Sequence, residues 1–151
     1  MFKRIVVPVD GSPTSNKALV AALNLARDCG ASLRLLHALD QLVYMGAYDY
    51  STELLAVVRE DAKRVLADAL AICQAAGIET DTVLIDDPGQ RLGISVAEEA
   101  KKWGADLIVV GTHGRRGIGR VLLGSGAEEI LRLAPVPVLT VRGEEERRDG
   151  Q

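Results

Sequence analysis

The chain has 151 residues, of which 48% are hydrophobic, 26% charged and only 3% aromatic. This is the usual size and composition of one globular domain. Its 18 basic and 21 acidic residues give a net charge of −3, which argues against broad non-specific binding to nucleic acid, because such binding needs a basic surface.

Two cysteines, Cys29 and Cys73, fall in segments with helical patterning. A domain of this size needs no disulfide, and no CxxC or Cys/His cluster indicates a metal site. We therefore expect two reduced, mostly buried thiols and a cytoplasmic protein. No apolar run approaches the roughly 20 residues that a membrane-spanning helix requires, so we expect neither a membrane nor nucleic acid as a partner.

The first third of the chain predicts one βαβ unit. Ile5–Val9 is a continuous apolar run, which is typical of a strand buried on both faces. Ser12 suits the N-cap of a helix and Pro13 its first position. The helix should end at Gly30, and Ser32–Ala38 predicts the second strand.

The same alternation continues to the end of the chain. After a loop over residues 40–52, the predicted elements are a long helix ended by Gly77, a strand over Glu79–Ile85, a helix ended by Gly104, a strand over Asp106–Val110, a short helix over Ser125–Leu133 and a strand over Val136–Arg142. Alternating strands and helices indicate an α/β fold with a mostly parallel sheet covered on both faces.

We therefore predict a single, doubly wound, Rossmann-like domain over residues 1–143, followed by a charged flexible tail over residues 144–151. Such sheets bind ligands at the carboxyl ends of their strands, where the winding reverses. The turns at Asp10–Pro13 and Gly111–Ser125 are the candidate site.

Residues 111–120 contain three arginines, one histidine and no acid. Glycines let backbone N–H groups approach an anion, and the helix that follows adds the positive end of its dipole. The segment suits phosphate binding, with a solvated turn as the alternative.

The spacing Gly111, two residues, Gly114, nine residues, Gly124-Ser125 resembles the ATP-binding signature of the universal stress protein family. The opening IVVPVDGS, the strand DLIVVGTHG and the closing APVPVLTVR fit the same family. The resemblance covers Ile5 to Arg142. It implies a five-stranded sheet in the order 3-2-1-4-5, a homodimer through the strand Val136–Arg142, and binding of ATP, or of ADP or AMP, with Mg²⁺ held through the phosphates and no direct protein ligand.

The resemblance also implies which residues contact the nucleotide. Asp10 should reach the ribose, and relatives commonly have Val or Thr at Gly126, so we expect this glycine to loosen the helix start and weaken binding. The implied adenosine-side residues are Pro8, Val9, Asp10 and Ala38, and the implied phosphate-side residues are Gly111, Thr112, His113, Gly114, Arg115, Arg116, Gly117, Gly124, Ser125 and Gly126.

Some of these residues have structural alternatives. Asp10 could instead cap the turn after the first strand. Ser125 forms an S-x-x-E capping box with Glu128, which we weigh equally with a phosphate contact. Glu128 and Glu129 would repel a phosphate, so we expect both to point away. His37 should pack at the end of the second strand.

His113 is expected to donate a hydrogen bond to phosphate rather than to act as a catalyst. The tyrosines of the loop, Tyr44, Tyr48 and Tyr50, are expected to form a partly buried cluster, with a lid over the nucleotide as the alternative.

No P-loop lysine motif and no G-x-S-x-G elbow is present, and we assign no catalytic residue. Together with this absence, the family resemblance implies a nucleotide-dependent sensor or regulator of the stress response. The alternatives are a slow magnesium-dependent ATP hydrolase that uses Asp10 and a nucleotide-free dimeric scaffold.

Overall fold

The computed structural model describes residues 1–39, 52–87, 89–112 and 125–143. The predicted tail, the tyrosine loop and most of the glycine-rich segment lie outside these residues. The elements are β1 (Arg4–Pro8), α1 (Pro13–Cys29), β2 (Ser32–Ala38), α3 (Thr52–Ala75), β3 (Thr80–Ile85), α4 (Leu92–Trp103), β4 (Leu107–Gly111), α5 (Ser125–Leu133) and β5 (Val138–Val141).

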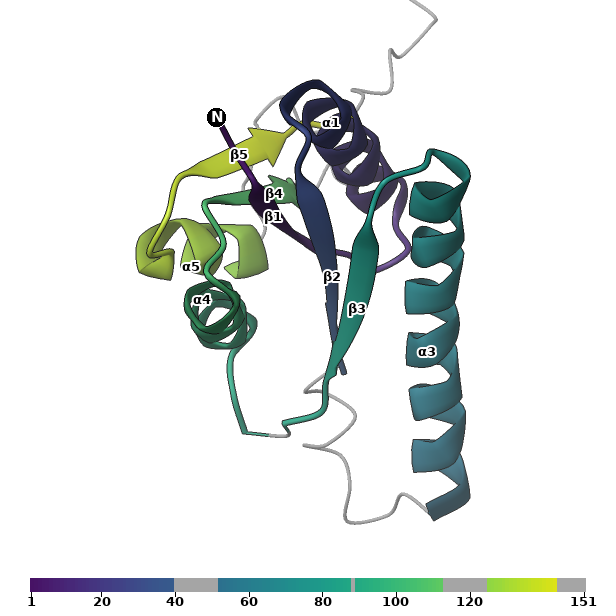
Figure 1. The fold of residues 1–151 in the computed structure, drawn as a ribbon. Coiled ribbons are helices and arrows are strands. Elements are labelled where there is room, and N and C mark those ends of the chain that lie inside the picture. Colours follow the sequence, from purple (N-terminus) through teal and green to yellow (C-terminus); the bar gives the residue numbers. More distant parts are fainter. Residues whose placement is uncertain (40–51, 88, 113–124, 144–151) are drawn as a thin grey trace, which may run out of the picture.

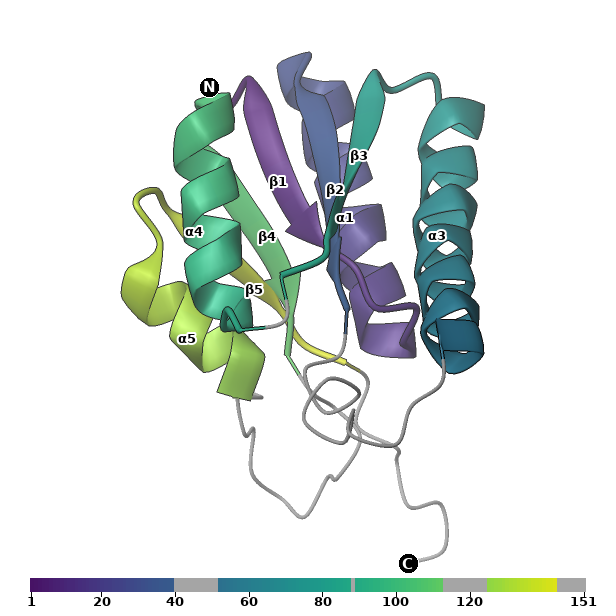
Figure 2. The same ribbon diagram turned by 90° about the horizontal axis from the view of Figure 1, so that it is seen from below.

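The five strands form one parallel sheet in the order β3-β2-β1-β4-β5. Helices α1 and α3 cover one face, and α4 and α5 cover the other (Figures 1 and 2). The predicted fold class and strand order are confirmed. The winding reverses between β1 and β4, which places the carboxyl ends of these two central strands beside each other.

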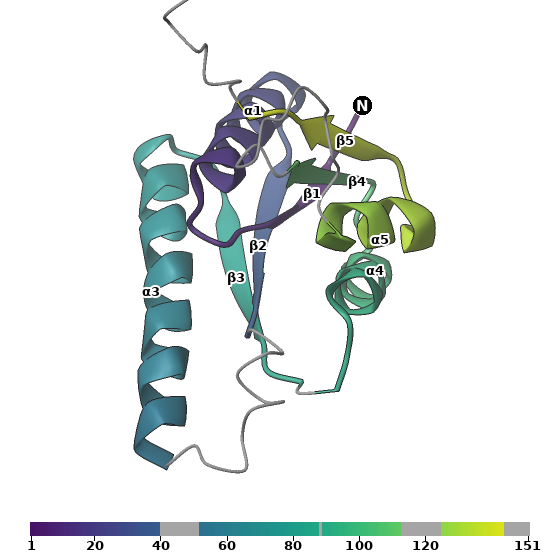
Figure 3. The same cartoon turned by 180° about the vertical axis from the view of Figure 1, so that it is seen from behind.

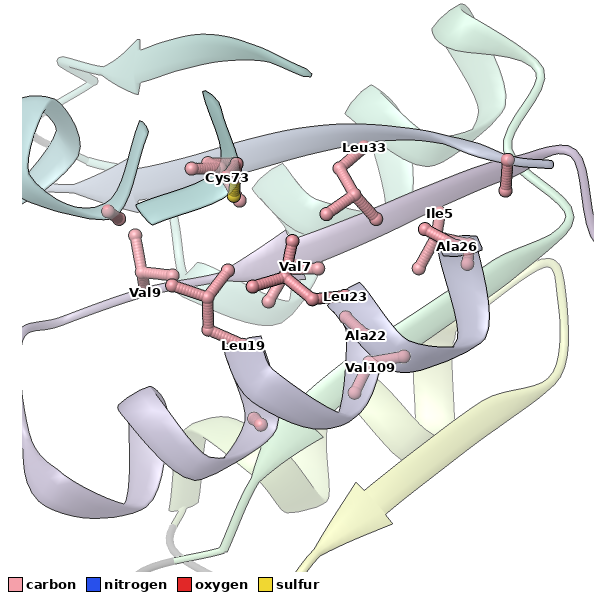
Figure 4. Close-up of a cluster of buried hydrophobic side chains, with 14 of the residues drawn as sticks. Ile5, Val7, Val9, Leu19, Ala22, Leu23, Ala26, Leu33, Cys73 and Val109 are labelled. Atoms are coloured by element: carbon pink, nitrogen blue, oxygen red, sulfur yellow. The ribbon is translucent and has the colours of Figure 1, made fainter. Parts of the chain in front are cut away.

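The core lies on both faces of β1. Ile5 and Val7 point into the layer of α1 and α3, where Figure 4 shows Val7 beside Leu23 and Ile5 beside Ala26 of α1. Val6 packs into the second layer, under α4 and α5. The three central residues of β1, Ile5, Val6 and Val7, are fully buried, which is why this strand reads as a continuous apolar run rather than an alternating one.

Helix α1 begins and ends as its sequence predicts. The Ser12 hydroxyl accepts a hydrogen bond from the Ser15 N–H at 3.2 Å, and Pro13 occupies the first turn. Gly30 ends the helix in the left-handed conformation, with φ of 68°, which an L side chain rarely adopts.

Several predicted strand ends are wrong by one or two residues. The fifth strand is Val138–Val141 rather than Val136–Arg142, because Pro137 has no N–H for the ladder, and only its carbonyl pairs, with the Ile108 N–H at 3.0 Å. The fourth strand is Leu107–Gly111 rather than Asp106–Val110, and the carboxylate of Asp106, just before it, accepts the backbone N–H groups of Lys3 and Arg4 at 2.8 and 3.1 Å.

The other two boundary errors are smaller. The first strand is Arg4–Pro8 rather than Ile5–Val9, and the third begins at Thr80 rather than Glu79.

Both cysteines are free; Cys73 is buried, whereas Cys29, the last residue of α1, is partly exposed. No helix among the described residues is both long and apolar enough to span a membrane.

A charged cluster surrounds Trp103 at the edge of the sheet where the strands begin. Arg34 makes two hydrogen bonds of 2.8 Å to Asp81, and its guanidinium lies 4.6 Å from the centroid of the Trp103 ring. The hydrogen bond to Asp81 raises the pKa of Arg34. Arg4 also lies over the ring, at 5.6 Å, and donates to the Trp103 carbonyl at 2.6 Å. The cluster ties together β1, β2, β3 and the end of α4.

Candidate functional site

A cavity of about 520 Å³ opens at the carboxyl ends of the strands. It lies at the reversal between β1 and β4, where ligands bind in doubly wound sheets. Its apolar lining includes Leu36, Ile85, Val110 and Ile130, and polar groups come from the turn after β1 and from the N-terminal ends of α1, α4 and α5. Figure 3 shows these elements from behind.

The structure brings seven of the predicted site residues together in the lining of this cavity. They are Pro8, Val9, Asp10, Ala38, Gly111, Thr112 and Gly126. Ser125 is the first residue of α5, beside them. The other predicted residues, His113, Gly114, Arg115, Arg116, Gly117 and Gly124, lie outside the described residues.

Asp10 caps the turn between β1 and α1. Its Oδ1 accepts the Ser12 N–H at 2.8 Å, and its own N–H donates to the Ser15 hydroxyl at 3.0 Å. Asp10 is nevertheless exposed and lines the cavity. Its capping role therefore holds the side chain at the position from which it would meet a ligand.

His37 fixes the backbone just after β1. Its Nδ1 lies 2.6 Å from the Val9 carbonyl oxygen. A carbonyl only accepts, so Nδ1 carries the proton, and Nε2 is an acceptor in the neutral ring. His37 is partly buried at the end of β2, as expected, and it ties the ends of β1 and β2 into one wall of the cavity.

Gly111 allows the end of β4 to approach the first turn of α1. A Cβ at this position would lie 2.7 Å from the Thr14 carbonyl oxygen and 2.9 Å from its Cγ2, which is closer than side-chain atoms pack. The next residue, Thr112, is buried and donates its N–H to the Val141 carbonyl at 2.9 Å. Packing thus fixes the point at which the glycine-rich segment leaves the sheet.

Gly126 has a packing role that the resemblance in the sequence did not suggest. A Cβ here would lie 3.0 Å from Cδ2 of Leu92. The missing side chain lets the first turn of α5 pack closely on α4, and the helix begins at Ser125 despite the glycine.

One prediction about the site is wrong, and it concerns Glu129. This residue does not point away but lines the cavity, and its Oε1 accepts the Gly93 N–H at 2.9 Å. The N-cap residue of α4, Arg91, makes no side-chain capping bond, so a carboxylate from α5 takes that place.

The α4 side of the cavity was missing from the sequence-based site. Asp87, Gln90, Arg91 and Leu92 all line it. The signal that could have found them is the turn Asp86–Gly89 after a strand, on the same edge of the sheet as Asp10. Among the described residues, no group of three or more His, Cys, Asp or Glu side chains is placed to hold a metal ion.

Comparison with known proteins supports the assignment made from the motifs. The sequence model of the universal stress protein family matches residues 1–142. The chain belongs to the universal stress protein family. It is 32% identical over 144 residues to universal stress protein MJ0531 of Methanocaldococcus jannaschii, covering 94% of this chain and 83% of that protein. It is 31% identical to universal stress protein YxiE of Bacillus subtilis, covering 94% and 100%.

Solved structures of other universal stress proteins share the fold. A family member from Burkholderia pseudomallei is 33% identical, with a TM-score of 0.72 over 92% of this chain and 95% of that one. A universal stress protein solved in complex with cAMP is 25% identical, with a TM-score of 0.67 over 93% and 97%. One from Archaeoglobus fulgidus in complex with dAMP is 24% identical, with a TM-score of 0.71 over 92% and 97%.

Proposed function

We propose that this universal stress protein binds an adenine nucleotide in the cavity at the carboxyl ends of β1 and β4. The observation that carries the proposal is the site itself: a cavity with both apolar and polar lining residues, at the reversal point of the sheet and beside the end of β4, from which the glycine-rich segment continues. Two neighbours that share the fold were solved with adenine nucleotides, cAMP and dAMP.

In this proposal the adenosine lies against Pro8, Val9 and Ala38, and Asp10 reaches the ribose. The phosphates extend toward Gly111, the segment from His113 to Gly124 and the N-terminus of α5, where backbone N–H groups and arginines would neutralise their charge. ATP, ADP or AMP would bind in this way, and Mg²⁺ would be held through the phosphates.

We further propose that nucleotide occupancy regulates a stress response in the cytoplasm and that the protein acts as a homodimer through β5. In this proposal Asp10 binds the ribose, while one of its carboxylate oxygens continues to accept the Ser12 N–H.

The first test is to denature the freshly purified protein and identify any released nucleotide by mass spectrometry. The second is calorimetry of ATP binding to the Gly114→Val variant, in which a branched side chain would block the approach of a phosphate to the backbone. We expect the wild type to bind ATP with a dissociation constant in the micromolar range, and the Gly114→Val variant to show no binding.

The matched control is Gly89→Val, because a Cβ at Gly89 meets nothing within 4 Å and the residue does not line the cavity. Equal ATP affinity in the wild type and in Gly114→Val would refute the proposed phosphate site.

A further inference from the structure

Three helices direct their N-terminal turns at the cavity. Thr14 and Ser15 of α1, Leu92 of α4 and Gly126 of α5 all line it. A helix N-terminus attracts anions, because its first N–H groups lack partners and its dipole ends there in positive partial charge. A phosphate group that enters the cavity therefore meets several candidate binding points, and something must select among them.

The protein's own side chains already cap two of these helix ends. The Ser12 hydroxyl accepts the Ser15 N–H at the start of α1. At the start of α4, the Gly93 N–H donates to Oε1 of Glu129 at 2.9 Å, from a residue 36 positions later in the chain. The two caps differ in charge, because the hydroxyl is neutral whereas the carboxylate is an anion.

The contact between Gly93 and Glu129 depends on the shape of both residues. A Cβ at Gly93 would lie 2.8 Å from both Cβ and Oε1 of Glu129, so only glycine allows the carboxylate to approach. Gly93 is buried, and Glu129 is partly buried on the cavity wall. A fixed carboxylate thus stands where an incoming anion would otherwise bind to α4.

We infer that Glu129 is a specificity-determining residue that keeps phosphate groups away from the N-terminus of α4 and leaves the N-terminus of α5 to bind them. This inference rests on the proposed nucleotide binding. The other charged side chains of the described cavity wall are Asp10, Asp87 and Arg91. The two additional acids give the wall the same sign as Glu129, and Arg91 is the one base among these residues.

Calorimetry with Glu129→Gln tests the charge without removing the hydrogen bond, because the amide oxygen still accepts the Gly93 N–H. We expect ATP to bind about three- to tenfold more tightly than to the wild type, with a larger effect at low salt. Adenosine, which carries no phosphate, should bind with unchanged affinity. A purely structural role would change both ligands by the same factor.

The matched control is Glu128→Gln, which removes the same charge from an exposed neighbour that does not line the cavity and keeps the capacity to form a capping box. An equal gain in ATP affinity in this control, equal changes for ATP and adenosine, or no gain in Glu129→Gln would overturn the inference.

A second measurement does not depend on nucleotide binding. Inorganic tripolyphosphate is titrated while the amide resonance of Gly93 is followed by NMR. We expect no movement in the wild type or in Glu129→Gln, where the N–H stays bonded, and a saturable shift in Glu129→Ala, where the α4 terminus is open. Movement of Gly93 in the wild type, or none in Glu129→Ala, would contradict the inference.

The two proposals can fail separately. If the wild type binds neither adenosine nor ATP, the proposed function is wrong. The tripolyphosphate titration followed at the Gly93 amide would still decide the role of Glu129.

Discussion

Cys73 and Cys29 differ in their surroundings although both are free thiols. Cys73 belongs to α3 and is fully buried in the core between the sheet and the helices α1 and α3 (Figure 4). Cys29, in contrast, is partly exposed. Burial raises the pKa of the Cys73 thiol, and its hydrogen bond with Thr80 lowers it by less. The thiolate is the reactive form of cysteine, so the two residues should differ in reactivity.

We expect a thiol reagent at about pH 8 to modify Cys29 readily and Cys73 only as fast as the protein unfolds. The single variants Cys29→Ala and Cys73→Ala assign each phase of the reaction. Equal rates for both thiols in the native protein would show that Cys73 is accessible.

The raised pKa of Cys73 also predicts how stability depends on pH. The unfolded thiol ionises first, so its contribution to stability is complete below an unfolded pKa of about 8.5 and is lost as the pH rises toward the folded value. Urea titrations from neutral to alkaline pH should show a smaller alkaline loss in Cys73→Ala than in the wild type.

Arg115 and Arg116 carry the expected phosphate contacts of the glycine-rich segment. Each charge-assisted hydrogen bond contributes about 1.5–3 kcal/mol when fully formed and less when exposed. We expect the double alanine variant to lose affinity for ATP but not for adenosine. The control replaces Lys101 and Lys102, two exposed cations at the far end of α4. If both double variants lose ATP affinity equally, net charge rather than local contact explains the effect.

At the scale of elements, the packing of β4 against α1 depends on Gly111. A methyl group there would meet the rigid backbone of Thr14 at 2.7 Å, so neither partner can move aside cheaply. We expect Gly111→Ala to lower the free energy of unfolding by about 1–3 kcal/mol, measured in urea. Gly89→Ala is the control, since nothing lies within 4 Å of its added methyl, and a similar loss there would show that the contact with Thr14 is not the cause.

The elements themselves could be predicted because their signals are local. The apolar run of β1, the cap at Ser12 and the glycine at position 30 each act within a few residues of the structure that they specify. The start of β5 was harder to predict, because Pro137 still accepts a hydrogen bond from β4 through its carbonyl but has no N–H for the ladder.

The site was predictable only in part for the same reason. The residues after β1 and β4 follow from the rule for doubly wound sheets. The contact between Glu129 and Gly93 does not, because it joins residues 36 positions apart and depends on the distance between two packed helices. Charge alone suggested that Glu129 should avoid the cavity, whereas the absent cap on α4 draws it in.

At the scale of the whole molecule, β5 is an edge strand with an exposed apolar side chain. Leu139 is 40% exposed, and Leu131 and Leu133 of the neighbouring α5 are 39% and 42% exposed. Unpaired strand edges are usually paired or protected, and pairing of two β5 strands about a two-fold axis would form a closed dimer.

Backbone direction identifies the variant that tests this dimer. The carbonyls of Pro137 and Val141 accept hydrogen bonds from Ile108 of β4 and from Thr112 just after it. By strand alternation, the backbone N–H and carbonyl of Leu139 also point toward β4, and those of Val138 and Thr140 point outward. We expect Thr140→Pro to shift the protein toward monomer in light scattering, whereas Thr140→Ala, which keeps its N–H, should remain dimeric. A monomeric wild type at micromolar concentration would contradict the proposed dimer.

The position of Trp103 gives the molecule a built-in optical reporter. It is the chain's single tryptophan, and it lies at the opposite end of α4 from the cavity, stacked with Arg4 and Arg34. Twelve helical residues separate the indole from the cavity wall by about 18 Å. A nucleotide in the cavity would not touch the indole, so a change in the tryptophan fluorescence on binding, excited selectively to exclude the three tyrosines, would report a movement of α4 or of the strands that hold the two arginines, rather than quenching by the ligand.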